Sequence, residues 1–359
     1  MNTFPRKSIT DQPFDRNKRE QFESVCRIAL SILIFTAWII VLPVHGWAQH
    51  NRIVYVASKG NFSSEEIYTM AADGTDHKRL TNNAARDFDP AWSPDGKKIA
   101  FASSMEGGPG SASDIFVMDA DGNNLRNLTQ NPRSWDRMPT WSPDGKRIAF
   151  VSGMGLVLNS EIYVMDTNGT NIKRLTNNRV ADREPAWSPN GKWIAYASEA
   201  DANENTNIYV ISPDGRKRKK LTNQIPEVDQ PSWSPDSRKI AFVSRLEGNP
   251  DICVMRVDGV LNGNQKPINK GDVTNLTKHI AHDYSPTWSP TGSRIAFNSE
   301  RQFGRMSIYV MAADGENVVR LTEPRSIHPN WVGPGGFSVD LRRLVTTWGA
   351  IKAAKGEKK

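Results

Sequence analysis

One short motif recurs through the chain, and it limits the fold more than any other feature. Pro-x-Trp-Ser-Pro-Asp-Gly occurs at 90–96 and 139–145, and variants follow at 185–191, 231–237 and 286–292, with a degenerate sixth copy at 329–335. The tryptophans of these copies are separated by 49, 46, 46, 55 and 43 residues. A period of this size is typical of a four-stranded propeller blade. The tryptophans are Trp92, Trp141, Trp187, Trp233, Trp288 and Trp331.

Each repeat unit reads as four strands joined by tight turns. Ser-Pro-Asp-Gly suits a type I turn, with proline second and glycine fourth. A β-rich run such as IAFAS at 99–103 follows, and then a variable loop and a third strand such as DIFVMD at 114–119. An Asp-Gly or Asn-Gly pair closes a tight hairpin, and the fourth strand ends in Leu-Thr in every unit. We expect no helix between 50 and 332.

The two ends of the repeat array predict how the structure closes. The chain enters at 53–58 on a sequence that matches a second strand, and the last repeat, at Trp331, matches a first strand. Pairing the N-terminal strands with this C-terminal strand would complete one blade and remove the open sheet edges. We therefore predict an all-β, six-bladed β-propeller over 49–339.

The N-terminal 48 residues carry an export signal. A fifteen-residue apolar run at 28–42 follows Arg27, and Gly46 and Ala48 supply the small residues that signal peptidase needs. Fifteen residues are short for a membrane span of about 20, but an uncleaved signal anchor is the alternative. Both interpretations predict a periplasmic or secreted propeller, or one anchored to the membrane and facing the periplasm.

Charge argues against a nucleic-acid-binding body. The chain has a net charge of +7, but residues 1–48 contribute +2 and residues 340–359 contribute +4, which leaves +1 for the predicted propeller. The basic run at 216–220 lacks interleaved aromatic residues for base stacking. The basic tail at 340–359 has the spacing of a short amphipathic helix that could dock on the propeller or contact a partner or membrane surface. We expect no nucleic acid, membrane contact only through the N-terminal segment or this tail, and a monomer.

The topology separates two faces with different sequence character. The Ser-Pro-Asp-Gly turns and Asp-Gly hairpins share one face, which we call the turn face. They are nearly identical between repeats, except for an insertion between Asp258 and Leu276. The other connections share the opposite face, which we call the loop face, and they vary from repeat to repeat. Variable loops on rigid strands commonly present binding sites, so we place function on the loop face, with Trp135 as a contact residue.

The connections that enter the innermost strands predict an acidic collar at the mouth of the channel. Its carboxylates could cap nearby backbone N–H groups, or they could bind a cation such as Ca²⁺ or a basic partner segment. Arg137 and Arg183 would partly neutralise the collar. The acidic candidates are Asp87, Asp89, Asp136, Asp182, Glu184, Asp229 and Asp283.

Metal and catalytic motifs are weak or missing. His279, His282 and His328 fall on the same face and could bind a transition metal, although their spacing is not diagnostic. The sequence contains no Gly-x-Ser-x-Gly, no His-Glu-x-x-His and no phosphate-binding loop. We therefore predict no catalytic residues and no required cofactor. Cys253 in a β-rich run is predicted to be a buried core thiol.

The repeat closely resembles that of the TolB-like propeller family, as in WSPDGKRIAF at 141–150 with EIYVMDTNG at 161–169. The resemblance covers about 51–332. It implies a six-bladed propeller, an envelope location and protein contacts across the loop face, which in TolB itself involve the lipoprotein Pal. TolB also carries an α/β domain before its propeller, whereas here about three residues separate Ala48 from the first strand. This departure puts a direct Tol–Pal role in doubt.

These observations favour a non-enzymatic, extracytoplasmic scaffold that binds an envelope protein or polysaccharide through its loop face. Some propellers with this repeat belong to lyases that attack oligogalacturonate and use a histidine–metal site. A metal-dependent carbohydrate-active enzyme is therefore the first alternative, and an accessory of the Tol–Pal system is the second.

Overall fold

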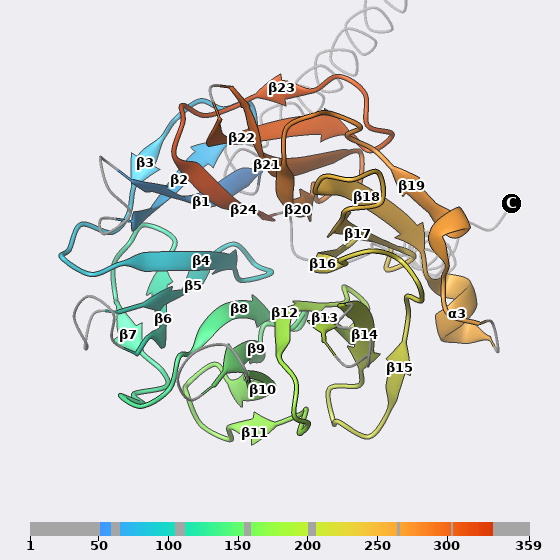
Figure 1. Ribbon diagram of the computed structural model, residues 1–359. Helices are drawn as coiled ribbons and strands as arrows, with labels where there is room; N and C mark the ends of the chain where they lie inside the picture. Colours follow the sequence, from blue (N-terminus) through green and yellow to red (C-terminus); the bar gives the residue numbers. More distant parts are fainter. Residues whose placement is uncertain are drawn as a thin grey trace, which may run out of the picture. The chain divides into compact units, whose positions relative to one another are not determined.

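The structure, a computed structural model, describes residues 51–58, 65–104, 112–153, 159–199, 206–263, 266–302 and 304–332. All of them belong to one compact unit, Ala48–Lys359. The described strands form six four-stranded antiparallel sheets arranged around a central axis (Figure 1). This confirms the predicted all-β, six-bladed propeller.

The six blades are numbered in chain order, and each is given from its innermost to its outermost strand. Blade 1 contains β24 (Ser326–Val332), β1 (Arg52–Ser58), β2 (Glu65–Ala71) and β3 (Lys78–Arg79). Blade 2 contains β4 (Asp87–Trp92), β5 (Lys98–Ser103), β6 (Asp114–Asp119) and β7 (Arg126–Asn127). Blade 3 contains β8 (Arg137–Trp141), β9 (Arg147–Ser152), β10 (Glu161–Asp166) and β11 (Lys173–Arg174). Blade 4 contains β12 (Asp182–Trp187), β13 (Ile194–Ser198), β14 (Asn207–Ile211) and β15 (Arg218–Lys220). Blade 5 contains β16 (Asp229–Trp233), β17 (Lys239–Ser244), β18 (Asp251–Arg256) and β19 (Val273–Asn275). Blade 6 contains β20 (Asp283–Trp288), β21 (Arg294–Gln302), β22 (Arg305–Ala312) and β23 (Val319–Arg320).

Blade 1 closes the ring from both ends of the repeat array, as the sequence predicts. β24 pairs antiparallel with β1, and Trp331 stands opposite Ile53. The indole Nε1 of Trp331 donates a hydrogen bond to Asn51 Oδ1 at 2.7 Å. The closed arrangement gives β1 a partner on both sides, β24 and β2, so no second strand stands at a sheet edge.

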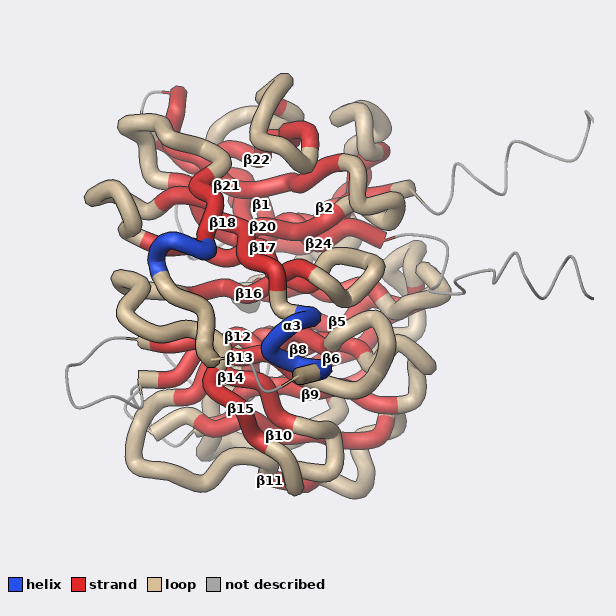
Figure 2. Tube along the Cα trace, turned by 90° about the vertical axis from the view of Figure 1, so that its right-hand side faces the viewer, coloured by secondary structure: helices blue, strands red, loops and turns tan. Residues whose placement is uncertain are grey.

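Two of the anchoring tryptophans link neighbouring blades by hydrogen bonds. Trp141 in blade 3 donates its Nε1 hydrogen to the carbonyl of Ala91 in blade 2 at 3.1 Å. Trp233 in blade 5 does the same to Ala186 in blade 4 at 3.0 Å. The second and third strands between these contacts are buried on both faces, because a blade covers them on each side. The side view in Figure 2 shows these strands stacked between two rims of connecting loops.

The repeated Leu-Thr has two separate structural roles. In all six blades the threonine Oγ1 accepts a hydrogen bond from the main-chain N–H of a third-strand isoleucine, at 2.9–3.0 Å. The leucine carbonyl packs against the glycine of the next blade's Asp-Gly hairpin. Gly169 has φ +87°, and a Cβ placed there would lie 2.6 Å from Leu128 O, so only glycine fits without displacement. The hairpin and the Leu-Thr are therefore two halves of one contact between blades.

The insertion between Asp258 and Leu276 departs from the expectation that the repeat array contains no helix. It forms a short helix, α3 (Asp258–Asn262), and a 3-10 turn at Lys270–Asp272. Val260 of α3 is buried against the core of blades 4 and 5, which explains why so short a helix is held in place. Within the described residues, no helix has the length and apolar character required to cross a membrane.

Candidate functional site

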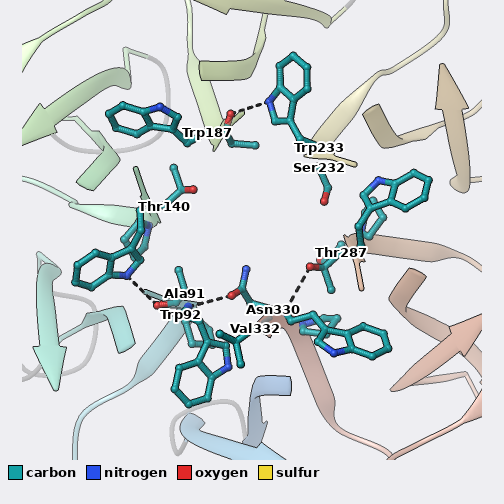
Figure 3. A pocket seen from close by; sticks show the side chains of 18 of the residues that line it. Ala91, Trp92, Thr140, Trp187, Ser232, Trp233, Thr287, Asn330 and Val332 are labelled. Carbon is teal, nitrogen blue, oxygen red and sulfur yellow. Dashed lines mark hydrogen bonds between the residues drawn. The ribbon is translucent and has the colours of Figure 1, made fainter. Parts of the chain in front are cut away.

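The innermost strands enclose a channel with a cavity of about 480 Å³. Each strand contributes its Pro-x-Trp segment to the wall. Viewed along the channel, the side chains of Thr140, Ser232, Thr287 and Asn330 project toward the centre, whereas the indoles of Trp187 and Trp233 point outward between the blades (Figure 3). Short side chains therefore project into the channel, while the tryptophans contribute to its wall and pack between the blades.

Six equivalent residues, one from each blade, stand at the loop-face end of this channel, and we call them the mouth ring. Each immediately precedes the proline of the repeat and lines the channel. All six have positive φ values, between 51° and 56°. Non-glycine residues rarely adopt this conformation, and such strain is concentrated at functional sites. The mouth ring consists of Asp89, Met138, Glu184, Gln230, Ser285 and His328.

A β-bulge produces this conformation in every blade. In blade 2 the pairing of β4 with β5 shifts register between Phe88 and Ala91, so that Asp89 and Pro90 have no partner in the ladder. Proline cannot donate a ladder hydrogen bond, which is why it occurs at bulges. Equivalent shifts occur in the other five blades. A bulge re-aims a side chain, and here it turns one residue of each blade into the channel.

Hydrogen bonds link members of the mouth ring to the next blade. Glu184 Oε2 accepts the main-chain N–H of Gln230 at 2.6 Å, and Gln230 Oε1 accepts that of Ser285 at 2.6 Å. Asp89 Oδ2 accepts the main-chain N–H of Met138 at 3.3 Å. The side chains are therefore held at fixed positions rather than left free in the channel.

Asp89 and His328 form an ion pair across the boundary between blades 1 and 2, with 2.9 Å between Oδ1 and Nδ1. Burial would raise the pKa of Asp89, but the hydrogen bond from His328 and the charges of His328 and Arg137 outweigh it and lower the pKa. Burial would likewise lower the pKa of His328, but the hydrogen bond and charge of Asp89 raise it above its ordinary value. Both shifts favour the charged pair.

The opposite side of the mouth ring has a different electrostatic character. Burial raises the pKa of the Glu184 carboxyl well above its usual range, and the negative charge of Asp229 adds to the effect. Asp229 itself is paired with Arg183, with 3.4 Å between Oδ1 and Nε. Glu184 therefore favours its neutral form, whereas Asp89 favours its charged form. The mouth ring thus contains two acids with opposite proton preferences.

Four of the predicted collar aspartates are buried and do not line the channel. Asp87 accepts hydrogen bonds from Ser103 Oγ at 2.5 Å and Asn83 Nδ2 at 2.8 Å. Burial raises the pKa of each of the four carboxyls, and hydrogen bonds to neighbouring hydroxyls partly oppose it. Their hydrogen-bond donors are side-chain hydroxyls, amides and a guanidinium, not the backbone N–H groups of the capping alternative, and their burial corrects their predicted placement at the mouth. The four are Asp87, Asp136, Asp182 and Asp283.

The remaining predicted residues are dispersed. Asp89 lies in the mouth ring, and Asp229 lies beside it, one residue before Gln230. Arg183 bridges Glu199 and Asp229, and Arg137 acts on Asp89 through its charge. Trp135 is half-buried, and its main-chain N–H donates to Gly153 O at 2.9 Å. Trp135 is therefore fixed to a neighbouring strand end and does not line the channel.

The three candidate metal ligands make separate interactions. His328 pairs with Asp89, His282 Nδ1 lies 3.1 Å from Glu300, and His279 Nδ1 accepts the Ala281 main-chain N–H at 3.0 Å. Among the described residues, no three His, Cys, Asp or Glu side chains are grouped closely enough to hold a metal ion. The structure therefore does not bring the predicted set together.

Sequence reasoning missed Met138, Gln230 and Ser285 and did not recognise the ring as a set. The signal was present, because the residue three positions before each blade tryptophan differs in every copy while the proline after it is constant. Most residues of four variable loops, at 59–64, 105–111, 154–158 and 200–205, lie outside the described residues, as do the export segment and the basic tail.

Comparison with known proteins supports the same fold. The family model described as TolB beta propeller domain matches residues 48–153 and 139–204. The Tol-Pal system protein TolB of Desulfosudis oleivorans is 34% identical over 67 residues, 19% of this chain and 14% of that protein. Dipeptidyl-peptidase 5 of Porphyromonas gingivalis is 42% identical over 50 residues, 14% of this chain and 7% of that protein. The crystal structure of TolB from Acinetobacter baumannii superimposes with a TM-score of 0.66 and 25% identity, covering 79% of this chain and 67% of that one.

The fold and channel define a closed six-bladed propeller with a differentiated ring at one mouth. The matched segments span less than a fifth of the curated relatives, so the similarity concerns the repeat and not the whole of either protein. The propeller of this chain is similar to TolB-type propellers: the family model matches residues 48–204, and the fold is shared with TolB from Acinetobacter baumannii.

Proposed function

We propose that this chain is a non-enzymatic, extracytoplasmic scaffold that binds an envelope protein at the mouth ring. The observation that carries the proposal is that one backbone position holds six different side chains in the same strained conformation. A purely structural role would favour one residue type there, as it does for the proline and tryptophan beside it. Differences between blades at a fixed, channel-facing position are what recognition of an asymmetric partner requires.

The chemistry of the ring supports a protein segment as the ligand. An apolar thioether at Met138, a neutral amide at Gln230 and a charged pair at Asp89–His328 stand around one opening. A peptide offers these same kinds of group, and methionine adapts to different apolar shapes. The ring is also held by hydrogen bonds between blades, so little ordering is needed on binding.

Two further observations support the envelope location. The apolar run at 28–42 with small residues before the predicted cleavage point is typical of an export signal. One relative is described as a Tol-Pal system protein, which agrees with a partner among envelope proteins.

Site-specific photo-crosslinking in intact cells tests this proposal. A photoreactive phenylalanine analogue replaces Met138 in the mouth ring, and a matched variant carries it at Asp314, a hairpin residue on the turn face. We expect the Met138 variant to capture one envelope protein, identified by mass spectrometry, and the Asp314 variant to capture none. Capture of the same proteins from both positions, or of none from Met138, would refute binding at the mouth ring.

A further inference from the structure

A second cavity, of about 960 Å³, lies on the turn face and crosses blades 2, 3 and 4. We call it the turn-face groove. It is lined by the Ser-Pro-Asp-Gly turns of these blades, by hairpin residues of blade 3 and by the outer strand of blade 2. Trp141, Pro143 and Trp187 line both this groove and the channel, so the groove opens off the channel at the end away from the mouth ring.

The acidic residue of each tight turn has a capping role that needs only one oxygen. Asp95 Oδ1 accepts hydrogen bonds from Ser93 Oγ at 2.7 Å and from the Lys97 main-chain N–H at 3.1 Å. In the hairpin of blade 1, Asp73 Oδ1 accepts from the main-chain N–H of Thr75 at 2.9 Å. The second carboxylate oxygen adds negative charge without adding to these caps, so asparagine can replace aspartate with the turn unchanged.

Two such replacements occur in the described repeats, and both line the turn-face groove. Asn168 is the only amide among the acidic or amide residues of the five described hairpins, since blade 5 has α3 in that place, and Asn190 is the only amide among the five described turn residues. Asn168 Oδ1 accepts the Thr170 main-chain N–H at 3.0 Å, and Asn190 Oδ1 accepts that of Lys192 at 3.0 Å. The caps are therefore preserved, and each amide adds a donor where the repeat elsewhere carries a charge.

Three cationic side chains line the same groove. An Nη of Arg126 donates to the main-chain carbonyl of Asn168 at 3.4 Å, which places the guanidinium beside that amide. Arg147 lies over the ring of Trp187, 5.0 Å from its centroid, and this stacking orients it. The third, Lys98, is half exposed and pairs with Asp119 at 2.7 Å. Because Asp119 offsets Lys98, the cationic groups open to a ligand are Arg126 and Arg147, whereas the two lining carboxylates, Asp95 and Asp144, accept hydrogen bonds within their own turns.

We propose that the turn-face groove binds an acidic oligosaccharide, with its anionic groups at Arg126 and Arg147 and its hydroxyls at the side-chain amides. Arginine is suited to carboxylate and phosphate, and Asn124, Thr167 and Ser142 supply further short polar groups to the lining. An acidic peptide is less favoured, because the strand edge in the groove, β7, has only two residues and is too short for strand addition.

The test restores the repeat's own residues. In N168D/N190D both positions carry the aspartate used in other blades, so the fold should be retained, and thermal unfolding checks this. Calorimetric titration with a hexamer of uronic acid should show binding that weakens about tenfold in the double variant, which corresponds to about 1.4 kcal/mol. The matched control, D214N/D236N, makes the reverse change at the same repeat positions outside the groove and should bind within about twofold of wild type.

Two further ligands separate the alternatives. Neutral maltohexaose should bind at least about tenfold more weakly than the hexauronate, and hexaglutamate should not compete with it. Absence of hexauronate binding, equal affinity of wild type and N168D/N190D, or stronger binding of hexaglutamate would each overturn the proposal. These outcomes do not bear on the mouth ring, because the groove lies at the other end of the channel.

Discussion

The Gly169→Ala substitution tests the contact that holds each blade to the preceding one. Alanine at φ +87° adopts a left-handed conformation that costs roughly 1–2 kcal/mol. Its Cβ would also lie 2.6 Å from Leu128 O, closer than real Cβ contacts allow. Leu128 cannot easily retreat, because its own N–H donates to Ile115 O at 2.8 Å and Thr129 Oγ1 accepts the Ile115 N–H at 3.0 Å.

We therefore expect Gly169→Ala to lower the free energy of unfolding by about 3–4 kcal/mol, since local displacement of packed groups adds roughly 1–3 kcal/mol to the conformational term. Gly215→Ala is the matched control. It occupies the equivalent hairpin of blade 4 at φ +78°, but its nearest new contacts, to Leu175, are 3.6 and 3.8 Å. That variant should lose only the conformational term of roughly 1–2 kcal/mol.

Urea unfolding followed by tryptophan fluorescence and circular dichroism measures both variants, with stability taken from linear extrapolation. The decisive quantity is the difference between Gly169→Ala and Gly215→Ala, which removes the shared effect of positive φ. Equal losses in the two variants would refute the argument that the hairpin's close approach to the preceding blade requires glycine.

Three further predictions concern buried groups. Because the pKa of His328 is raised, its pairing with Asp89 stabilises the fold fully below about pH 6.5 and is lost as the pH rises through the folded-state pKa. Because the pKa of Asp89 is lowered, the pair stays charged down to below about pH 3.9. The melting-temperature penalty of His328→Asn should thus be larger at about pH 5.5 than at about pH 9, and equal penalties would contradict the pairing. In a Cys26→Ser background, Cys253 should resist alkylation until the protein unfolds, because burial raises its pKa to about 12; rapid labelling of native protein would argue against its burial. Thr222→Val should destabilise by about 1–3 kcal/mol in urea, since it leaves a buried third-strand N–H without an acceptor; a neutral effect would show that the hydroxyl is dispensable.

The propeller was predictable from sequence because its signals are local. Ser-Pro-Asp-Gly and Asp-Gly specify turns by the conformations of their own residues, and strand alternation then places Trp92 and its equivalents in the packing between blades. Ring closure was predicted because the sequence at Ile53 matches a second strand and the sequence at Trp331 matches a first strand. The pairing of β1 with β24 confirms it.

The site was less predictable because it depends on positive φ values at residues whose sequence context predicts an extended backbone. A residue before proline normally prefers an extended conformation, so nothing marked Glu184 or Gln230 as having positive φ. The bulge also changes which side chains face the channel, and so Asp87 is buried while Asp89, two residues later, reaches the mouth. The helix α3 was missed because five residues within a Gly-, Asn- and Pro-containing insertion carry little helical signal.

The contacts between blades also give the ring a direction of assembly. The hairpin glycines of blades 2, 3, 4 and 6, and the two tryptophans that donate to a carbonyl of the preceding blade, find their partners in chain that is synthesised earlier. Blades can therefore fold one upon another as the chain emerges, through contacts about one repeat apart. The closing junction is the exception, since Asn51 and Trp331 are 280 residues apart and Gly74 of blade 1 meets Leu321 of blade 6. Until β24 is synthesised, the inner edge of β1 stands unpaired, so this long-range step is where slow or interrupted synthesis would expose the protein to misassembly.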